Sequence, residues 1–213
     1  MVLVLLTGFT TFSFGEAFYG FTTGLYRLSE AYVKEYYGRD MDGVNFNFSI
    51  TYFPEKSIFG VYSQTSLGVI SSAYEWDNED MLTLSSNVVY DFRFYLAPSL
   101  KLQLGEKLRI PVSLGPVFTI FREEGWSYYD DSDGGSFYEA IGMGVFVDAA
   151  FVFNPSRWFF LRSGVTAGWD FLRIERGHMI SDLREADRTP FYGSVPYAAF
   201  YGTIYFGIGI RVY

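Results

Sequence analysis

The ten residues VNFNFSITYF, at positions 44–53, alternate strictly between two kinds of side chain. Every second position is apolar and the positions between are polar, the apolar set being Val44, Phe46, Phe48, Ile50 and Tyr52. Successive side chains of a β-strand point to opposite faces, so this pattern predicts a strand between two different environments. The fold then depends on which face of this strand meets water.

The same alternation recurs along the chain. Six further segments show it clearly, at 57–69, 82–104, 108–121, 141–153, 158–171 and 202–213. An eighth strand at 18–28 is less regular, because Phe21 and Leu25 share a phase with Arg27. Pro98, Pro111 and Pro116 interrupt two of the strands, and proline removes a donor from the β-ladder. We therefore expect eight strands, with bulges or lost hydrogen bonds near these prolines.

The connections between the predicted strands alternate in length. Short turns rich in Pro, Gly and Asn are expected at 54–57, 105–107 and 154–157. Long polar loops are expected at about 29–43, 71–81, 122–137 and 173–196. Membrane barrels have short turns at one end and longer loops at the other. The pattern favours an all-β fold, an eight-stranded antiparallel up-and-down transmembrane β-barrel.

The charged residues indicate which face is enclosed. Eight of them lie inside predicted strands, all on the polar phase of their own strand: Asp91, Arg93, Lys101, Arg109, Asp148, Arg162, Asp170 and Arg211. Charges enclosed in a narrow barrel must be paired. We expect Asp148 to contact Arg162 across the 154–157 turn, and Asp91 and Arg93 to join Lys101, Arg109 or Arg211. This lumen charge network is either a gate or a polar core that plugs the barrel, and we favour the plug.

Two closed barrels fit the alternation. A lipocalin-like soluble barrel places the apolar face inside around a ligand, whereas a membrane barrel places it in lipid. The polar face carries too few charges for a protein surface in water, so we expect the apolar face to meet lipid. Aromatic girdles are then expected near the short turns, from Tyr52, Phe53, Phe94, Tyr95, Phe151, Phe153 and residues 158–160, and near the loops, from Tyr74, Trp76, Trp169 and Phe171.

Composition excludes several classes of site. The sequence has no cysteine, one histidine and a net charge of -8, which argue against a thiolate metal site, a histidine-cluster metal site and a nucleic-acid partner. We expect no cofactor and no metal. Residues 1–15 are mostly apolar with small residues at Ser13 and Gly15, which is typical of a signal peptide, so residues 16–213 are expected to form a single barrel domain.

In its architecture, this chain resembles the small eight-stranded outer-membrane barrels of the OmpA, OmpX and OmpW type. The resemblance covers about residues 18–213 and rests on strand phase and connection length, not on a diagnostic motif. It implies an outer-membrane location, contact with membrane lipid and insertion by the barrel assembly machinery. That machinery reads a terminal strand that ends in an aromatic residue, and Tyr213 provides one, although on the phase of Arg211 and not on the apolar phase.

The expected function is that of a structural or narrow-pore membrane protein, without enzymatic activity. An adhesin-like module that binds a surface ligand through its acidic, aromatic loops, at 74–80 and 126–138, is the first alternative; a lipocalin-like barrel is the second. The loop residues Asp131, Asp133 and Gly134 match only part of a calcium-binding loop. His178 and Ser181 lie in a predicted long loop and not on a strand that faces lipid; His178 could serve as a base, but we interpret it as a solvated loop residue and expect no catalytic site there.

Overall fold

The computed structural model describes residues 15–30, 41–78, 81–129, 132–180, 188–195 and 199–213. These residues form nine strands: β1 (Gly15–Glu30), β2 (Met41–Pro54), β3 (Phe59–Asn78), β4 (Met81–Gln103), β5 (Leu108–Tyr129), β6 (Ser132–Phe153), β7 (Phe159–Ile180), β8 (Arg188–Val195) and β9 (Ala199–Val212). No helix among the described residues is long and apolar enough to cross a membrane.

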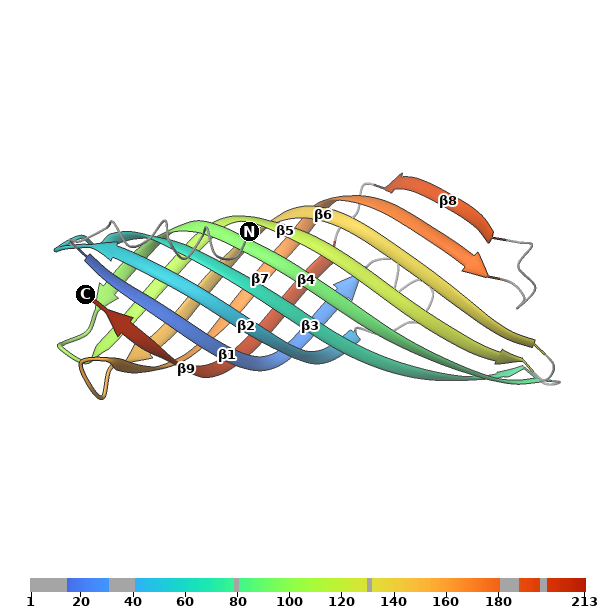
Figure 1. Ribbon diagram of the computed structural model, residues 1–213, viewed down its shortest axis with the longest axis horizontal. Coiled ribbons are helices and arrows are strands. Elements are labelled where there is room, and N and C mark those ends of the chain that lie inside the picture. The colour runs from blue at the N-terminus through green and yellow to red at the C-terminus, as the bar shows by residue number, and fades with distance from the viewer. Residues whose placement is uncertain (1–14, 31–40, 79–80, 130–131, 181–187, 196–198) are drawn as a thin grey trace.

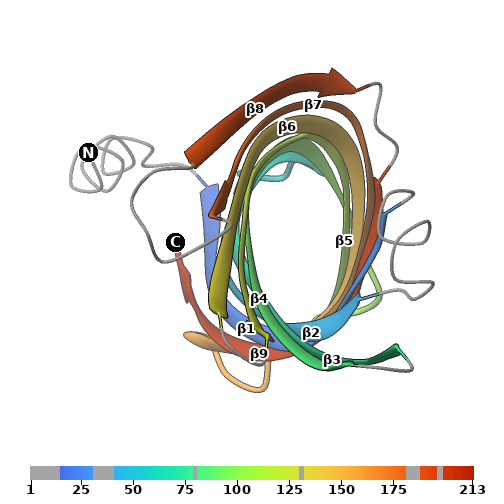
Figure 2. The ribbon, with the colours of Figure 1, turned by 90° about the vertical axis from the view of Figure 1, so that its right-hand side faces the viewer.

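Eight of the described strands close into a barrel. β1 to β7 pair in chain order as antiparallel neighbours, and β9 pairs with both β7 and β1 to close the ring (Figures 1 and 2). Among the described residues, β8 pairs only with residues 173–180 of β7, and it lies outside the ring. Closure satisfies the backbone groups that an open sheet edge would expose to hydrocarbon. The predicted fold class, an eight-stranded antiparallel up-and-down barrel, is confirmed.

The strands are strongly tilted, and the register gives the stagger that accompanies this tilt around the ring. Successive neighbours around the ring run from Gly20 in β1 through Ser49, Gln64, Tyr95, Val117, Gly144, Asp170 and Ala199. Ala199 pairs with Glu30, so the path returns to β1 ten residues beyond its start. Strand number and this stagger together fix tilt and diameter, and eight strands leave an interior that side chains fill.

The two faces of the barrel answer the question raised by residues 44–53. Phe46 and Phe48 are 44% and 48% exposed on the outer face, whereas Asn45, Asn47 and Ser49 are buried inside. The same division holds around the ring, where the exposed large side chains are overwhelmingly aliphatic and aromatic. Such a surface suits hydrocarbon and not water. The lipocalin-like alternative, which requires the apolar face inside, is therefore wrong.

β1 follows the same division despite its irregular sequence. Phe18, Tyr26 and Leu28 are buried in the lumen, and Phe21 and Leu25 are exposed to the outside. The outward Arg27 lies near the loop end of the strand, where its Nε is 3.5 Å from Asp42 Oδ1. The ambiguity in the sequence arises because large aromatic side chains also fill the lumen.

The short turns lie at one end of the barrel, together with Gly15 and the C-terminus (Figure 1). Gly105 has a φ of 92° in the second turn, a conformation that glycine adopts without strain. At the other end, the strands run on through segments that the sequence indicates as loops. β3 and β4 continue pairing to Asn78 and Met81, β5 and β6 to Tyr129 and Ser132, and β7 pairs with β8.

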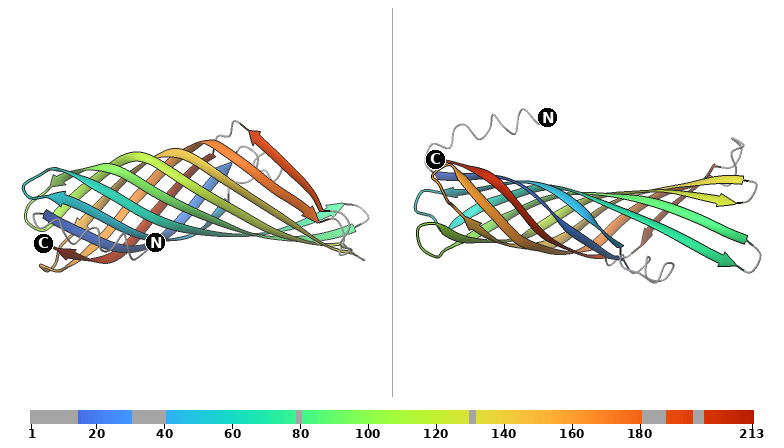
Figure 3. Two further views of the ribbon diagram at one scale, coloured as in Figure 1. Left: turned by 45° about the horizontal axis from the view of Figure 1, so that its top comes forward. Right: turned by 90° about the horizontal axis from the view of Figure 1, so that it is seen from below.

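These extensions form hairpins that project beyond the closed ring (Figure 3). β2 pairs with β3 only as far as Ile70, so the remainder of β3 pairs on one side alone. A hairpin with water on both faces needs no apolar alternation, which explains why the sequence pattern ends before the strands do. Residues 31–40, in the predicted loop at 29–43, lie outside the described residues.

The prolines interrupt the ladder as predicted. The pairs of β4 and β5 stop at Tyr95 and Val117 and resume at Ser99 and Ser113, leaving out the segments that contain Pro98 and Pro116. A similar gap surrounds Pro111 between β5 and β6. A bulge in β7 was not predicted: Met143 pairs with Leu172 but Gly144 pairs with Asp170. The extra residue, Phe171, allows two consecutive apolar side chains to face outward.

Candidate functional site: the filled lumen

Large aromatic rings in the lumen lie against glycines on neighbouring strands. A methyl group added at Gly168 would overlap the ring of Tyr201, and one added at Gly164 would lie 2.6 Å from the Tyr205 hydroxyl. Because glycine has no side chain, each ring can occupy the space beside it. Any side chain at these inward positions would collide with the ring. The same pairing recurs at Gly60 with Phe53, at Gly68 with Tyr26 and at Gly209 with Phe160.

The structure places all eight of the predicted lumen charges inside the barrel. They separate into three groups, and each group includes residues that sequence reasoning missed. The loop-side cluster comprises Tyr26, Asp91, Arg93, Thr119, Asp170 and Tyr201. The central cluster comprises Ser49, Asp148, Arg162, Thr166 and Tyr205. The turn-side cluster comprises Glu16, Lys101, Arg109 and Arg211.

Arg93 organises the loop-side cluster. Its Nε and Nη2 donate to Asp91 Oδ2 at 2.9 and 2.8 Å, and its Nη1 donates to Asp170 Oδ1 at 3.1 Å. The guanidinium carbon lies 3.5 Å from the centroid of the Tyr201 ring, and the Tyr26 hydroxyl donates to Asp91. Arg93 is 1% exposed. One buried cation thus joins strands on opposite sides of the lumen.

The central cluster contains the predicted contact between Asp148 and Arg162. Arg162 Nη2 donates to Asp148 Oδ1 at 2.7 Å, which confirms this prediction. The second carboxylate oxygen accepts from Thr166 at 2.8 Å and from Tyr205 at 2.7 Å. Arg162 also donates to Ser49 on β2, so the cluster crosses the barrel. Both charges are fully paired, as buried charges require.

Glu16 organises the turn-side cluster, and sequence reasoning missed it. Arg109 donates to both Glu16 oxygens, Arg211 Nη2 donates to Oε1 at 2.8 Å, and Lys101 Nζ lies 4.0 Å from Oε2. The expectation that Asp91 and Arg93 would join these three cations is wrong, because the strand tilt places the two groups at different depths. A usable signal was present: three inward cations near the short turns lacked an acidic partner.

The aromatic girdles differ in part from the prediction. Phe53, Tyr95 and Phe160 were expected at the turn-side girdle but are buried in the lumen. They share the inward phase of their strands. Glycines on neighbouring strands accommodate Phe53 and Phe160, and Tyr95 packs edge to face on Phe146, with ring centroids 4.7 Å apart. Trp158 remains outside and is 61% exposed. Tyr213, Phe59, Phe151 and Phe153 are also exposed near the short turns.

At the loop side, Trp169 and Phe171 are exposed as expected for a girdle. Trp169 also stacks on Phe200, with ring centroids 6.0 Å apart and planes at 10°. The side chains of Tyr74 and Trp76 lie outside the described part of the structure. So do those of the loop candidates Asp131, Asp133, His178 and Ser181, and Gly134 belongs to the same segment as the first two. Among the described residues, no group of three or more His, Cys, Asp or Glu could hold a metal ion.

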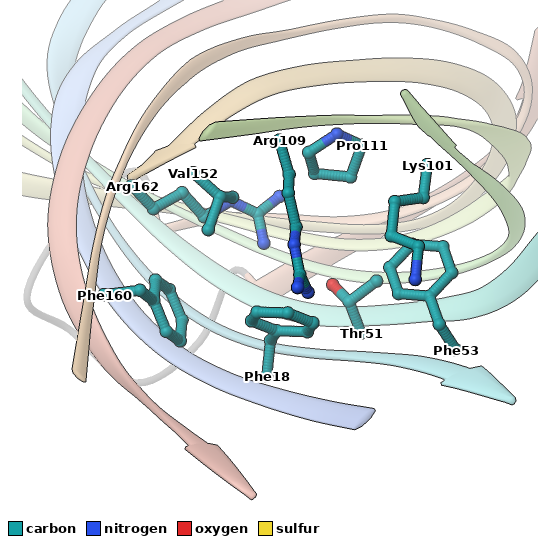
Figure 4. A pocket seen from close by; sticks show the side chains of 9 residues that line it. All are labelled: Phe18, Thr51, Phe53, Lys101, Arg109, Pro111, Val152, Phe160 and Arg162. Atoms are coloured by element: carbon teal, nitrogen blue, oxygen red, sulfur yellow. The ribbon is translucent and has the colours of Figure 1, made fainter. Parts of the chain in front are cut away.

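A small cavity lies between the central and turn-side clusters (Figure 4). Its volume is about 10 Å³, which is close to the least that a single water molecule requires. Phe18, Phe53 and Phe160 surround it, and Thr51 and Arg109 point into it. The aromatic rings and the paired charges leave little free space at this depth of the lumen. Wider cavities lie elsewhere, one of about 650 Å³ lined in part by Tyr26 and Thr166, and one of about 270 Å³ lined in part by Glu16 and Lys101.

No protein-family model matches the sequence, and no curated protein matches it. The fold is similar to solved structures. A major outer membrane protein from Thermus thermophilus is 9% identical with a TM-score of 0.50, over 91% of this chain and 99% of that one. Neisserial surface protein A is 7% identical with a TM-score of 0.49, over 91% of this chain and 96% of that one. Ail of Yersinia pestis is 12% identical with a TM-score of 0.45, over 93% and 99%. At these identities, the similarity shows the fold alone.

Proposed function

We propose that this chain is an integral outer-membrane barrel whose lumen is plugged and whose activity lies in the hairpins that project from one end. The observation that carries the proposal is the stack of three cross-lumen charge clusters. Arg93, Arg162 and Asp148 are each 2% exposed or less, so their charges face one another and not a water-filled channel. The proposal implies membrane lipid and the barrel assembly machinery as partners.

The energy of the clusters argues against spontaneous opening. A water path past the loop-side cluster requires Arg93 to leave both Asp91 and Asp170. A buried charge that loses its partner without being hydrated costs about 3–5 kcal/mol, so a partial separation of these groups is unfavourable. The central cluster adds a second barrier of the same kind. The two clusters in series favour a closed lumen.

The projecting hairpins support the second part of the proposal. Among the described residues they form an open sheet, in which the segment of β3 after Ile70 pairs with β4 alone and β8 pairs with β7 alone. Their tips are acidic in sequence, with Glu75, Asp77, Glu79 and Asp80 in the first hairpin. An open, charged sheet held above a rigid barrel suits binding of a surface ligand, as in the adhesin-like alternative. No catalytic role is proposed.

A liposome-swelling assay tests the plugged lumen. Vesicles that contain the refolded chain are diluted into an isosmotic sugar such as arabinose, with a known porin as the positive control. We expect no swelling beyond that of empty vesicles, because the proposed plug blocks a continuous water path through the lumen. Swelling that scales with the amount of folded protein would contradict the proposal.

A further inference from the structure

Gly202 on β9 differs from the inward glycines of the closed ring. Its neighbours Tyr201 and Thr203 are buried in the lumen, so Gly202 lies on the outer, lipid-facing side of the strand. A methyl group added here would meet no atom of the described residues, apart from its chain neighbours, closer than the Thr166 carbonyl oxygen at 4.0 Å. Packing within the barrel therefore does not require glycine at this position. Glycine weakens a strand, and it often marks a place that a ligand approaches closely.

A hollow of about 650 Å³ lies over Gly202 on the outer surface. Ala167 on β7 pairs with Gly202, and these two small residues form its floor. Leu25, Val165 and Ile204 rise beside the floor and are 72%, 50% and 68% exposed. The lining comes from β1, β2, β7 and β9, which are neighbours in the ring, so the hollow opens outward and not into the narrow lumen. Its volume is within the range of ligand sites, about 300–1,000 Å³.

A charged pair lies at one end of this hollow. Arg27 pairs with Gly202 in the β1–β9 ladder and with Asp42 in the β1–β2 ladder, and both charged residues line the hollow. Their side chains are 62% and 71% exposed. An exposed ion pair holds its two partners only weakly. The planar guanidinium of Arg27 is therefore accessible to a phosphate group, whose geometry it matches.

The strand tilt places the two ends of the hollow at different depths. The path around the ring in the direction from β1 to β2 returns ten residues nearer the loop side, from Gly20 to Glu30, so the reverse path descends. The descent is roughly 3 Å per strand, for a strand spacing of about 4.8 Å and a tilt of about 40°. Arg27 thus lies nearest the loop-side boundary of the apolar surface, and Gly202 and Ala167 lie progressively deeper.

The stacked rings of Trp169 and Phe200 bound the floor on its loop side. They pair with each other one outward position beyond Ala167 and Gly202, and they are 42% and 59% exposed. A molecule that follows the hollow therefore meets a cation at its upper end and an apolar channel below. This arrangement matches an amphipathic molecule with an anionic head and a hydrocarbon chain.

We propose that the hollow binds one membrane lipid that carries a phosphate group, with the phosphate on Arg27 and an acyl chain over Gly202 and Ala167. Arg27 supplies charge-assisted hydrogen bonds, and the ion pair with Asp42 orients its guanidinium. The chain gains dispersion contacts with the floor that a large side chain at position 202 would prevent. The proposal rests on the placement of the apolar face in lipid, which the proposed function shares, but not on a closed lumen or on the projecting hairpins.

Native mass spectrometry of the refolded chain in detergent provides the test, after a heat-dependent gel shift has confirmed folding. The chain is titrated with dimyristoyl phosphatidylglycerol or with dimyristoylglycerol, which has the same acyl chains but no phosphate. We expect one phospholipid to bind with saturation. Dimyristoylglycerol should bind at least about tenfold more weakly, the effect expected of one hydrogen bond between charged groups.

Two substitutions separate the acyl chain from the phosphate. Gly202→Phe fills the hollow without a clash in the barrel, so the chain should fold but bind the phospholipid at least about tenfold more weakly. Ser63→Phe, a similar change at an outward position of β3 that does not line the hollow, should bind as the unmodified chain does. Arg27→Gln should remove the preference for the phospholipid over dimyristoylglycerol, and Arg27→Lys should restore part of it.

Three results would overturn the proposal. One is equal phospholipid binding by Gly202→Phe and Ser63→Phe; another is an undiminished preference for the phospholipid in Arg27→Gln. The third is a folded, unmodified chain that binds no phospholipid in a saturable way, which would contradict this site alone. Failure of the unmodified chain to fold in detergent and in lipid would instead contradict the lipid-facing surface on which the proposed function also rests.

Discussion

Replacing Arg162 with methionine tests whether the central cluster is held together by its ion pair. Asp148 is fully buried and would keep its hydrogen bonds from Thr166 and Tyr205, but it would lose its counter-charge. Removing one partner of a buried pair typically costs about 3–5 kcal/mol, because the remaining charge stays desolvated. We expect Arg162→Met to lower the free energy of unfolding by this amount.

A double-mutant cycle isolates the pair. Asp148→Asn keeps an oxygen that accepts from the two hydroxyls while removing the charge, so in the Arg162→Met background it should restore most of the lost stability. We expect a coupling energy of at least about 2 kcal/mol, within the range observed for contacting residues. Lys107→Met, at an exposed position of the second short turn, is the control and should change stability by less than about 0.5 kcal/mol.

The assay is equilibrium unfolding in urea of the chain refolded in lipid vesicles, followed by fluorescence of its four tryptophans. A loss below about 1 kcal/mol for Arg162→Met would contradict the estimate for a buried pair. Strict additivity of the two single changes would refute the reasoning more directly, because it would mean that the two charges do not interact.

Three further predictions concern the rest of the barrel. Gly168→Ala places a methyl group against the Tyr201 ring and should cost about 1–3 kcal/mol by vesicle unfolding, and Tyr201→Leu in the same chain should recover part of it. Val147→Arg, midway along the lipid face of β6, should cost about 2–4 kcal/mol by the same measurement, whereas Val212→Arg beside the turn end should cost about 0–1; equal costs would contradict the lipid assignment. Replacing residues 74–85 with an Asn-Gly turn should leave the heat-modified gel shift and its midpoint unchanged, because the closed ring lies below this hairpin; loss of the shift would contradict that division.

The fold could be predicted from the sequence because its main cause is local. In a strand that separates lipid from an enclosed polar interior, each residue must suit one of two environments, and the period of two is then visible in stretches such as residues 44–53. The face on which each of the eight lumen charges lies could also be predicted, because a charged side chain in lipid is costly. Strand number and strand direction followed from counting these stretches.

The partners within the lumen could not be predicted in the same way. Glu16 and Arg211 are 195 residues apart and meet only because β1 and β9 close the ring. Their pairing depends on the stagger of the whole barrel, which no single strand encodes. The contact between Asp148 and Arg162 was predictable because one short turn joins β6 and β7.

The aromatic residues illustrate a second limit. Phe53 and Phe160 lie near the short turns, where girdle aromatics are expected, yet they fill the lumen. Residue type alone does not distinguish the two sides, because both lipid and a narrow lumen accept a large ring. The distinguishing signal is an inward glycine on a neighbouring strand, such as Gly209 beside Phe160, and it becomes visible only when the register is known.

The most direct test of the plugged lumen is single-channel recording of residues 16–213, refolded in lipid and inserted into a planar bilayer after a heat-dependent gel shift has confirmed folding. The three charge clusters and the aromatic rings between them predict a silent bilayer with no discrete current steps over a range of voltages. Reproducible steps from the folded chain would contradict the account and show that the clusters line a pore.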